Sequence, residues 1–143
     1  MSALTGARFA PFKTIRKMNL VLKAGATAYL GGSAALNPAL ACVQPAASGT
    51  AGLIPVGQFE ANVDNSASTA TSYVLTSLTH EIECVWLDNV TGANAVTSLN
   101  LYQNCYIADD HTVTMATGSN AVYGRVWAVD ANQGVLVQFN QWA

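Results

Sequence analysis

"SLNLYQNCYIADDHTVTMATGSNAVYGRVWAVDANQGVLVQF", residues 98–139, is the most regular part of the sequence. Short runs of apolar and β-branched residues alternate in it with turn-forming groups such as "ATGSN" and "DANQG". Many short strands at regular turn spacing are typical of all-β barrels and sandwiches. The sequence therefore predicts an all-β fold, with a single compact β-barrel or sandwich-like domain.

The same pattern extends toward the N-terminus. In "HEIECVWLD", residues 80–88, the apolar Ile82, Cys84 and Trp86 alternate with two glutamates, as in a strand with one solvated face. This alternation predicts that Trp86 is buried in the core, and Trp127 is predicted to be buried in its own alternating run. The sequence contains no visible internal repeat.

The chain is poor in charge. Charged residues make up 10% of it, against about 25% in an ordinary globular domain, and Thr, Ser, Asn and Ala are abundant instead. Such a surface is either covered by neutral polar groups or partly buried against partners. We favour the second interpretation, a subunit of an assembly.

The basic residues gather near the N-terminus. Five of the six Lys and Arg residues are Arg8, Lys13, Arg16, Lys17 and Lys23. Because residues 1–17 show no sustained period, they predict an extended arm that is disordered in the free subunit, and residues 18–143 predict the barrel-like domain. The arm has three interpretations: nucleic-acid binding by counterion release, docking on an acidic protein surface, or a solvated tail.

Asp109, Asp110 and His111 form the most site-like cluster. They follow a predicted strand, where Asp is favoured because its side chain can accept a hydrogen bond from the backbone two residues on. Adjacent residues of an extended chain point to opposite faces, so the two carboxylates are expected to diverge unless the turn reorients them. The sequence predicts a turn, with no catalytic, cofactor-binding or metal-binding residue. A His80/His111/Asp site assembled by folding is the alternative.

Targeting and redox signals are weak. No run approaches the roughly 18 apolar residues of a membrane span, and Lys23 interrupts the one segment that faintly suggests a signal peptide. Cys42, Cys84 and Cys105 form no C-x-x-C pair, and their odd number argues against a disulfide framework. Cys84 and Cys105 are predicted to be small core residues in a reducing cytoplasm.

Three stretches together resemble the small capsid cement, or head decoration, proteins of tailed bacteriophages. They are "GLIPVGQFEANVDNSAS" at 52–68, "CYIADDHTVTM" at 105–115 and "VYGRVWAVDANQGVLVQF" at 122–139. The likeness covers roughly residues 18–139 and leaves the arm outside. It implies a compact β-barrel-like domain in which "DDHT" is the tip of a hairpin.

The resemblance also implies a function. Such a protein is made in the host cytoplasm, binds the outside of an icosahedral shell and bridges neighbouring major capsid proteins, without enzymatic activity or cofactor. The expected partners are the major capsid protein and neighbouring copies of the chain, with no membrane and no direct nucleic-acid contact. We expect the contacts to involve the arm and the C-terminal tryptophan: Arg8, Phe9, Phe12, Lys13, Arg16, Lys17 and Trp142.

Other functions stay open at this point. Trp142 has a second interpretation, in which it closes one end of the barrel. The chain is alternatively another virion module, such as a tail or baseplate spacer. Less favoured are an enzyme with a folded-together His/Asp site and an exported protein that binds carbohydrate through exposed aromatic residues.

Overall fold

The structure is a computed structural model that describes residues 17–67, 72–78 and 84–139. Its elements are β1 (Lys17–Leu22), β2 (Thr27–Ala28), β3 (Ser33–Asn37), β4 (Cys42–Pro45), β5 (Ile54–Phe59), β6 (Val63–Asp64), β7 (Ser72–Leu78), β8 (Cys84–Asn89), the 3-10 helix η1 (Ser98–Asn100), β9 (Asn104–Ile107), β10 (Thr112–Thr114), β11 (Val122–Asp130) and β12 (Gly134–Phe139). The predicted all-β barrel class is confirmed. Within the described ranges, no helix is long and apolar enough to cross a membrane.

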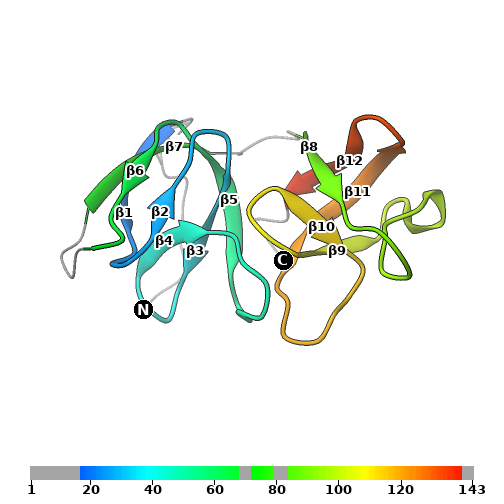
Figure 1. Cartoon of the computed structure of the whole chain (residues 1–143), viewed down its shortest axis with the longest axis horizontal. Coiled ribbons are helices and arrows are strands. Elements are labelled where there is room, and N and C mark those ends of the chain that lie inside the picture. Colours follow the sequence, from blue (N-terminus) through cyan, green and yellow to red (C-terminus); the bar gives the residue numbers. More distant parts are fainter. Residues whose placement is uncertain (1–16, 68–71, 79–83, 140–143) are drawn as a thin grey trace, which may run out of the picture.

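The first half of the chain closes into a five-stranded barrel with the order β1-β4-β3-β5-β7 (Figure 1). The β1–β4 pair is parallel and the other pairs are antiparallel. β2 and β6 form a separate two-stranded sheet. The buried core of this barrel consists of apolar side chains that range in size from alanine to phenylalanine: Leu22, Ala28, Ala34, Val43, Val56 and Phe59.

The second half closes into another five-stranded barrel, with the order β10-β8-β12-β11-β9. Here the β8–β10 pair is parallel and the rest are antiparallel. The described part of the chain thus contains two barrels, side by side in Figure 1, where the sequence predicted one.

The two barrels share one topology. In each, the first strand runs parallel to the third, the third pairs with the second, the second with the fourth, the fourth with the fifth, and the fifth closes onto the first. β1, β3, β4, β5 and β7 therefore correspond to β8, β9, β10, β11 and β12. The chain contains an internal structural repeat that its sequence does not show.

The correspondence extends to strand register. Gly57 in β5 and Gly124 in β11 occupy equivalent places, each aligned with both neighbouring strands and each beside a bulge in the pairing with the second strand of its barrel. The glycine at 124 is sterically required, because a Cβ atom there would overlap the carbonyl oxygen of Gln138 on β12. These matched glycines align the two barrels residue by residue.

The barrels are packed together through a shared apolar cluster. Ala35, Ala46 and Leu53 from the first half are buried in the same cluster as core residues of the second barrel, among them Tyr123 and Phe139. The rings of Tyr123 and Phe139 stack with centroids 5.7 Å apart. A continuous core of this kind makes the two barrels one structural body.

Two tryptophans predicted to be buried are exposed. Trp86 in β8 has a relative exposure of 42%, and Trp127 in β11 has 39%. The residues of β8 that reach the core are Val85 and Leu87. The prediction was wrong because both sides of this strand carry apolar residues, so alternation alone did not show which side faces inward.

The cysteines also differ in burial. Cys105 is fully buried, as predicted, and burial raises the pKa of its thiol to about 12. Cys84 is only half-buried and lies two residues from Trp86, on the same side of β8. All three cysteines are free thiols, in agreement with the expectation that they form no disulfide framework.

Candidate functional site

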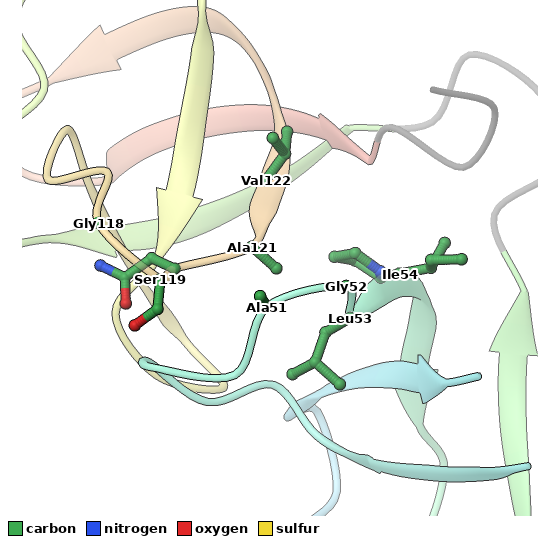
Figure 2. Close-up of a pocket in the computed structure, with 10 residues that line it drawn as sticks. Ala51, Gly52, Leu53, Ile54, Gly118, Ser119, Ala121 and Val122 are labelled. Atoms are coloured by element: carbon green, nitrogen blue, oxygen red, sulfur yellow. The ribbon is translucent and has the colours of Figure 1, made fainter. Parts of the chain in front are cut away.

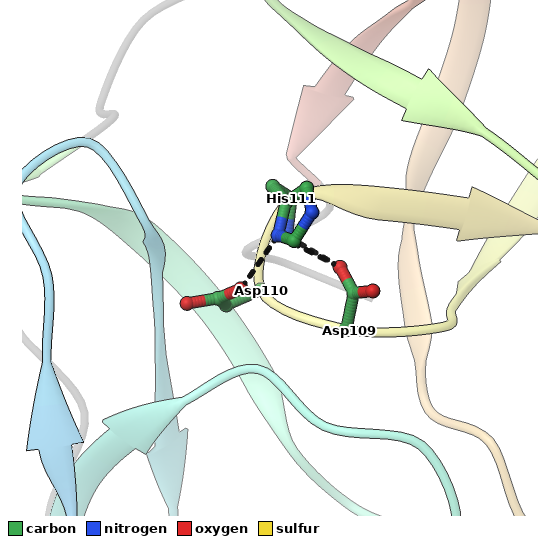
Figure 3. A group of neighbouring side chains, drawn as sticks. All are labelled: Asp109, Asp110 and His111. Carbon is green, nitrogen blue, oxygen red and sulfur yellow. Dashed lines mark hydrogen bonds and ion pairs between the residues drawn. The ribbon is translucent and has the colours of Figure 1, made fainter.

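The predicted turn connects β9 to β10 and contains Asp109, Asp110 and His111 (Figure 3). Asp109 Oδ1 accepts a hydrogen bond of 2.9 Å from the backbone N–H of His111, two residues on. This is the turn-forming bond that the sequence predicted for an aspartate here. The prediction of a turn is confirmed.

The two carboxylates nevertheless converge, contrary to the expectation from the sequence. His111 Nδ1 lies 2.8 Å from Asp110 Oδ1 and 3.1 Å from Asp109 Oδ1. The expected divergence was wrong because the chain is bent here and is no longer extended. The hydrogen bond to Asp110 raises the pKa of His111, with the charges of Asp109, Asp110 and Asp88 acting in the same direction against the opposing effect of burial.

This cluster combines two carboxylates and an imidazole, which are common metal ligands. Its three ligand atoms lie within 4.8 Å of one another. The histidine is, however, already paired with both carboxylates and largely exposed. The turn also contacts the first barrel, where the carbonyl of Asp110 accepts a 2.7 Å hydrogen bond from the backbone N–H of Ser33. The geometry describes a junction between the barrels.

A groove of about 360 Å³ lies between the segments 51–55 and 118–122 (Figure 2). Small and apolar side chains line it, and none of its lining residues has an ionisable side chain. Across one end, the amide oxygen of Asn120 accepts a 2.8 Å hydrogen bond from the backbone N–H of Gly49. The groove offers no group for acid–base chemistry, and no basic side chain lines it that could activate its one hydroxyl, Ser119, as a nucleophile.

A different surface has the residue types of a binding site. The strands β8, β12 and β11 follow one another around the second barrel, and the segment after η1 is hydrogen-bonded to β11. They contribute Trp86, Leu136, Trp127 and Tyr102, in that order. We call these four residues the aromatic face. Three of them are exposed and Leu136 is half-buried. Leu99, three residues before Tyr102 in η1, is also exposed, at 86%.

The aromatic face is held in place by specific contacts. The rings of Tyr102 and Trp127 meet edge to face, with centroids 5.4 Å apart and planes at 89°. Trp127 Nε1 donates a 2.8 Å hydrogen bond to Gln138 Oε1 on the neighbouring strand. Tyr102 has a backbone φ of 64°, a strained conformation for a bulky residue, and its N–H donates to the carbonyl of Val126 at 2.7 Å. The indole and phenol rings are thus ordered before any partner binds.

The first barrel supplies an internal comparison for this surface. Counting strand partners from the matched glycines, Trp86 corresponds to Asn19 in β1 and Arg125 corresponds to Gln58 in β5. Asn19 is exposed, like Trp86. Since the same scaffold accepts a polar side chain at this position, the fold does not require the tryptophan. The aromatic face was not predicted from the sequence, because both tryptophans were assigned to the core.

The residues predicted to make partner contacts lie almost entirely outside the described part of the chain. Arg8, Phe9, Phe12, Lys13, Arg16 and Trp142 fall outside it, as does His80 of the alternative metal site. Only the backbone of Lys17 is described, as the first residue of β1. The arm therefore stays a prediction. Comparison of the chain with protein-family models, with curated proteins and with solved structures finds no match in any of the three.

Proposed function

We propose that this chain is a non-enzymatic structural protein of a tailed-phage virion, which binds the outer surface of the capsid and bridges major capsid protein subunits. The resemblance of residues 52–68, 105–115 and 122–139 to cement proteins supports this function. The observation that carries the proposal is the exposed aromatic face of the second barrel.

Large exposed apolar surfaces on folded domains mark interaction sites. Trp, Tyr and Arg dominate the energetics of protein interfaces, and Arg125, two residues before Trp127 on β11, is exposed. The ion pairs found among the described residues do not involve Arg125, so its charge is available to a partner. An assembly subunit that buries this surface would also explain the low charge content of the chain.

The N-terminal arm supplies the second contact in this proposal. Arg8, Lys13, Arg16 and Lys17 would pair with acidic groups of the shell, with Phe9 and Phe12 as apolar anchors. Several weak patches that engage together give an avidity that exceeds the affinity of each patch alone. The chemistry required is contact area and charge pairing.

Co-sedimentation with purified undecorated shells tests the role of the aromatic face. Trp86→Asn combined with Trp127→Ala should reduce the amount of protein that pellets with shells while leaving the fold intact by circular dichroism. The matched control is Asn19→Ala, at the position of the first barrel equivalent to Trp86. Equal pelleting of the double variant and the parent would remove the aromatic face from the function.

Exposure of Trp86 and Trp127 also favours a second candidate, a carbohydrate-binding protein. A sugar ring stacks on the flat face of an aromatic side chain, and two such rings are exposed here. Against this, the perpendicular Tyr102 and Trp127 rings form no common flat platform. Quenching or enhancement of tryptophan fluorescence by soluble polysaccharides, lost in Trp127→Ala, would support the carbohydrate function.

A further inference from the structure

We infer that the aromatic face binds the same face of a second copy of this chain, in a two-fold symmetric dimer. The inference rests on the proposed function and narrows it: the aromatic face meets a neighbouring copy of the chain, and the arm of each copy contacts the capsid protein. It follows from the order of charged and apolar side chains across the outer side of the second barrel.

The outward side chains of β8, β12 and β11 form three rows, because antiparallel pairing aligns them across the sheet. One row contains Cys84, Gln138 and Arg125, which are aligned in the strand ladders. The next row contains Trp86, Leu136 and Ala128, and Trp127 is the unpaired residue of the bulge between Val126 and Ala128. The third row contains Asp88 and Asp130, the latter aligned with Gly134.

This arrangement places a cation at one end, an apolar middle row and carboxylates at the other end. Arg125, Asp88 and Asp130 are all exposed. The rows of Arg125 and Asp88 are about four residues apart along the strands, which is roughly 13 Å at about 3.3 Å per residue. The surface is therefore bipolar, with its apolar part in the centre.

A two-fold axis that lies in this surface, passes through Leu136 on β12 and is perpendicular to the line from Arg125 on β11 to Asp88 on β8 makes such a surface complementary to itself. An isologous interface places residue i of one copy against residue j of the other, and j against i. Rotation about this axis lays the tryptophans and Leu136 of the two copies together and brings Arg125 of each copy to the carboxylate end of the other. Two equivalent ion pairs then flank an apolar centre, which is the usual anatomy of a specific interface.

Asp88 is the better partner for Arg125. Asp130 Oδ1 already accepts hydrogen bonds from the backbone N–H groups of Asn132 and Gln133, at 2.8 and 2.9 Å, and these bonds lower the pKa of its carboxyl. Its carboxylate is thus committed to the turn between β11 and β12. Asp88 lies in β8 where that strand pairs with β10, and its side chain is exposed.

A charge-reversal pair tests this symmetry in free protein. Arg125→Glu puts two carboxylates together in both ion pairs of a homodimer, and Asp88→Lys puts two cations together there. In a heterodimer, Asp88 of the Arg125→Glu copy meets Arg125 of the Asp88→Lys copy. The new glutamate of the first copy meets the new lysine of the second, so both contacts are again opposite-charge pairs. Molar mass by light scattering, over a concentration series, should show the parent as a dimer, each variant alone as a monomer, and the equimolar mixture as a dimer.

Trp86→Asn provides an independent variant that uses the residue found at the equivalent position in the first barrel. It should shift the parent dimer to monomer without loss of the folded circular dichroism spectrum. A parent protein that stays monomeric at every concentration would overturn the inference, as would variants that dimerise alone as well as the parent does. A mixture of folded variants that stays monomeric would contradict the Arg125–Asp88 pairing.

Because the mass is measured without shells, the two proposals fail separately. A monomeric parent that still pellets with shells removes the dimer and leaves the cement function. A dimeric parent that never pellets with shells does the reverse. If the parent is a monomer and Trp86→Asn no longer binds shells, the aromatic face binds the capsid protein. That result would overturn the dimer.

Discussion

His111 shows how the turn controls a single ionisable group. The hydrogen bond to Asp110, with the nearby charge of Asp109, favours the protonated imidazole and raises its pKa above the ordinary value of about 6.5. A raised folded-state pKa stabilises the protein at pH values below the unfolded pKa. This contribution is lost as the pH rises through the folded pKa. It is small, because the histidine side chain is 62% exposed and its pairs are screened by solvent.

We predict that Asp110→Asn moves the pKa of His111 back toward its ordinary value. The measurement is a pH titration of the histidine ring protons by NMR, with the His111 signal assigned from a His111→Gln variant. Asp64→Asn, in β6 of the first barrel, is the control and should leave the titration unchanged. An unaltered midpoint in Asp110→Asn would show that the paired geometry does not persist in solution.

Gly124 determines how closely β11 and β12 approach each other. A Cβ atom at this position would overlap the carbonyl of Gln138 and lie 2.8 Å from Val137 Cγ1, and both neighbours are fixed in the strand. We predict that Gly124→Ala destabilises the protein by about 3 kcal/mol or more, since backbone and core must both move. Urea unfolding monitored by circular dichroism measures this change.

Gly92 is the matched control for that substitution. It has a φ of 87°, but a Cβ atom added there would have no described atom within 4 Å, so Gly92→Ala meets only the conformational cost of about 1 kcal/mol. Equal losses of stability in the two variants would mean that the strand contact does not set the requirement for glycine at 124.

At the level of strands, the sequence predicts which segments form strands better than it predicts which side of each strand faces the core. Turn residues such as Asp130 act locally, so the hairpin from β11 to β12 is predictable from its neighbours in the chain. The inward side of β8 depends on packing against distant strands. Val85 and Leu87 lie on one side of β8, and Cys84 and Trp86 lie on the other. Both pairs are apolar, so the local sequence does not show which pair faces the core.

The candidate sites show the same limit. The bond from the backbone of His111 to Asp109 spans two residues and was predictable. The convergence of Asp110 onto the same ring, and the contact of its carbonyl with Ser33, depend on how the hairpin bends against the first barrel. The aromatic face was not predictable, because its definition requires the orientation of β8 and β11.

At the level of the whole molecule, the two barrels should unfold together. Leu53 is 4% exposed and belongs to the cluster shared by both barrels. We predict that Leu53→Ala lowers the free energy of unfolding by about 2 to 5 kcal/mol and lowers amide-exchange protection in β3 and in β11 alike. The exposed Leu99 is the control, since Leu99→Ala should change stability by less than about 0.5 kcal/mol. Loss of protection confined to one barrel would show that the barrels unfold independently.

The duplication of the barrel was not visible in the sequence because few equivalent positions keep the same residue. Gly57 and Gly124 match, as do Val43 and Val113, which take equivalent places in β4 and β10. Elsewhere the residue differs even where burial is kept, as for Tyr123 and Val56 or for Val126 and Phe59. Many apolar side chains fill a small barrel core equally well, so topology persists where sequence identity does not.

The arm is predicted to serve attachment and not folding. Deleting residues 1–16 should leave the melting temperature nearly unchanged and markedly weaken attachment to shells. Charge reversal at Arg16 and Lys17 should weaken attachment in part, most visibly at low salt, because exposed pairs are screened over about 8 to 10 Å at ordinary ionic strength. Thermal unfolding and co-sedimentation are measured side by side. Unchanged shell occupancy by the truncated protein would reduce the arm to a solvated tail.

The most direct test of the proposed function is the binding isotherm of the parent protein on purified undecorated shells, measured by co-sedimentation. The proposal predicts binding that saturates at a fixed number of copies per shell, together with shells that resist heat better once they are occupied. Tails purified from the same virions are the control and should not deplete the protein from solution. Absence of saturable pelleting with shells, or preferential binding to tails, would contradict the assignment of this chain as a capsid cement protein.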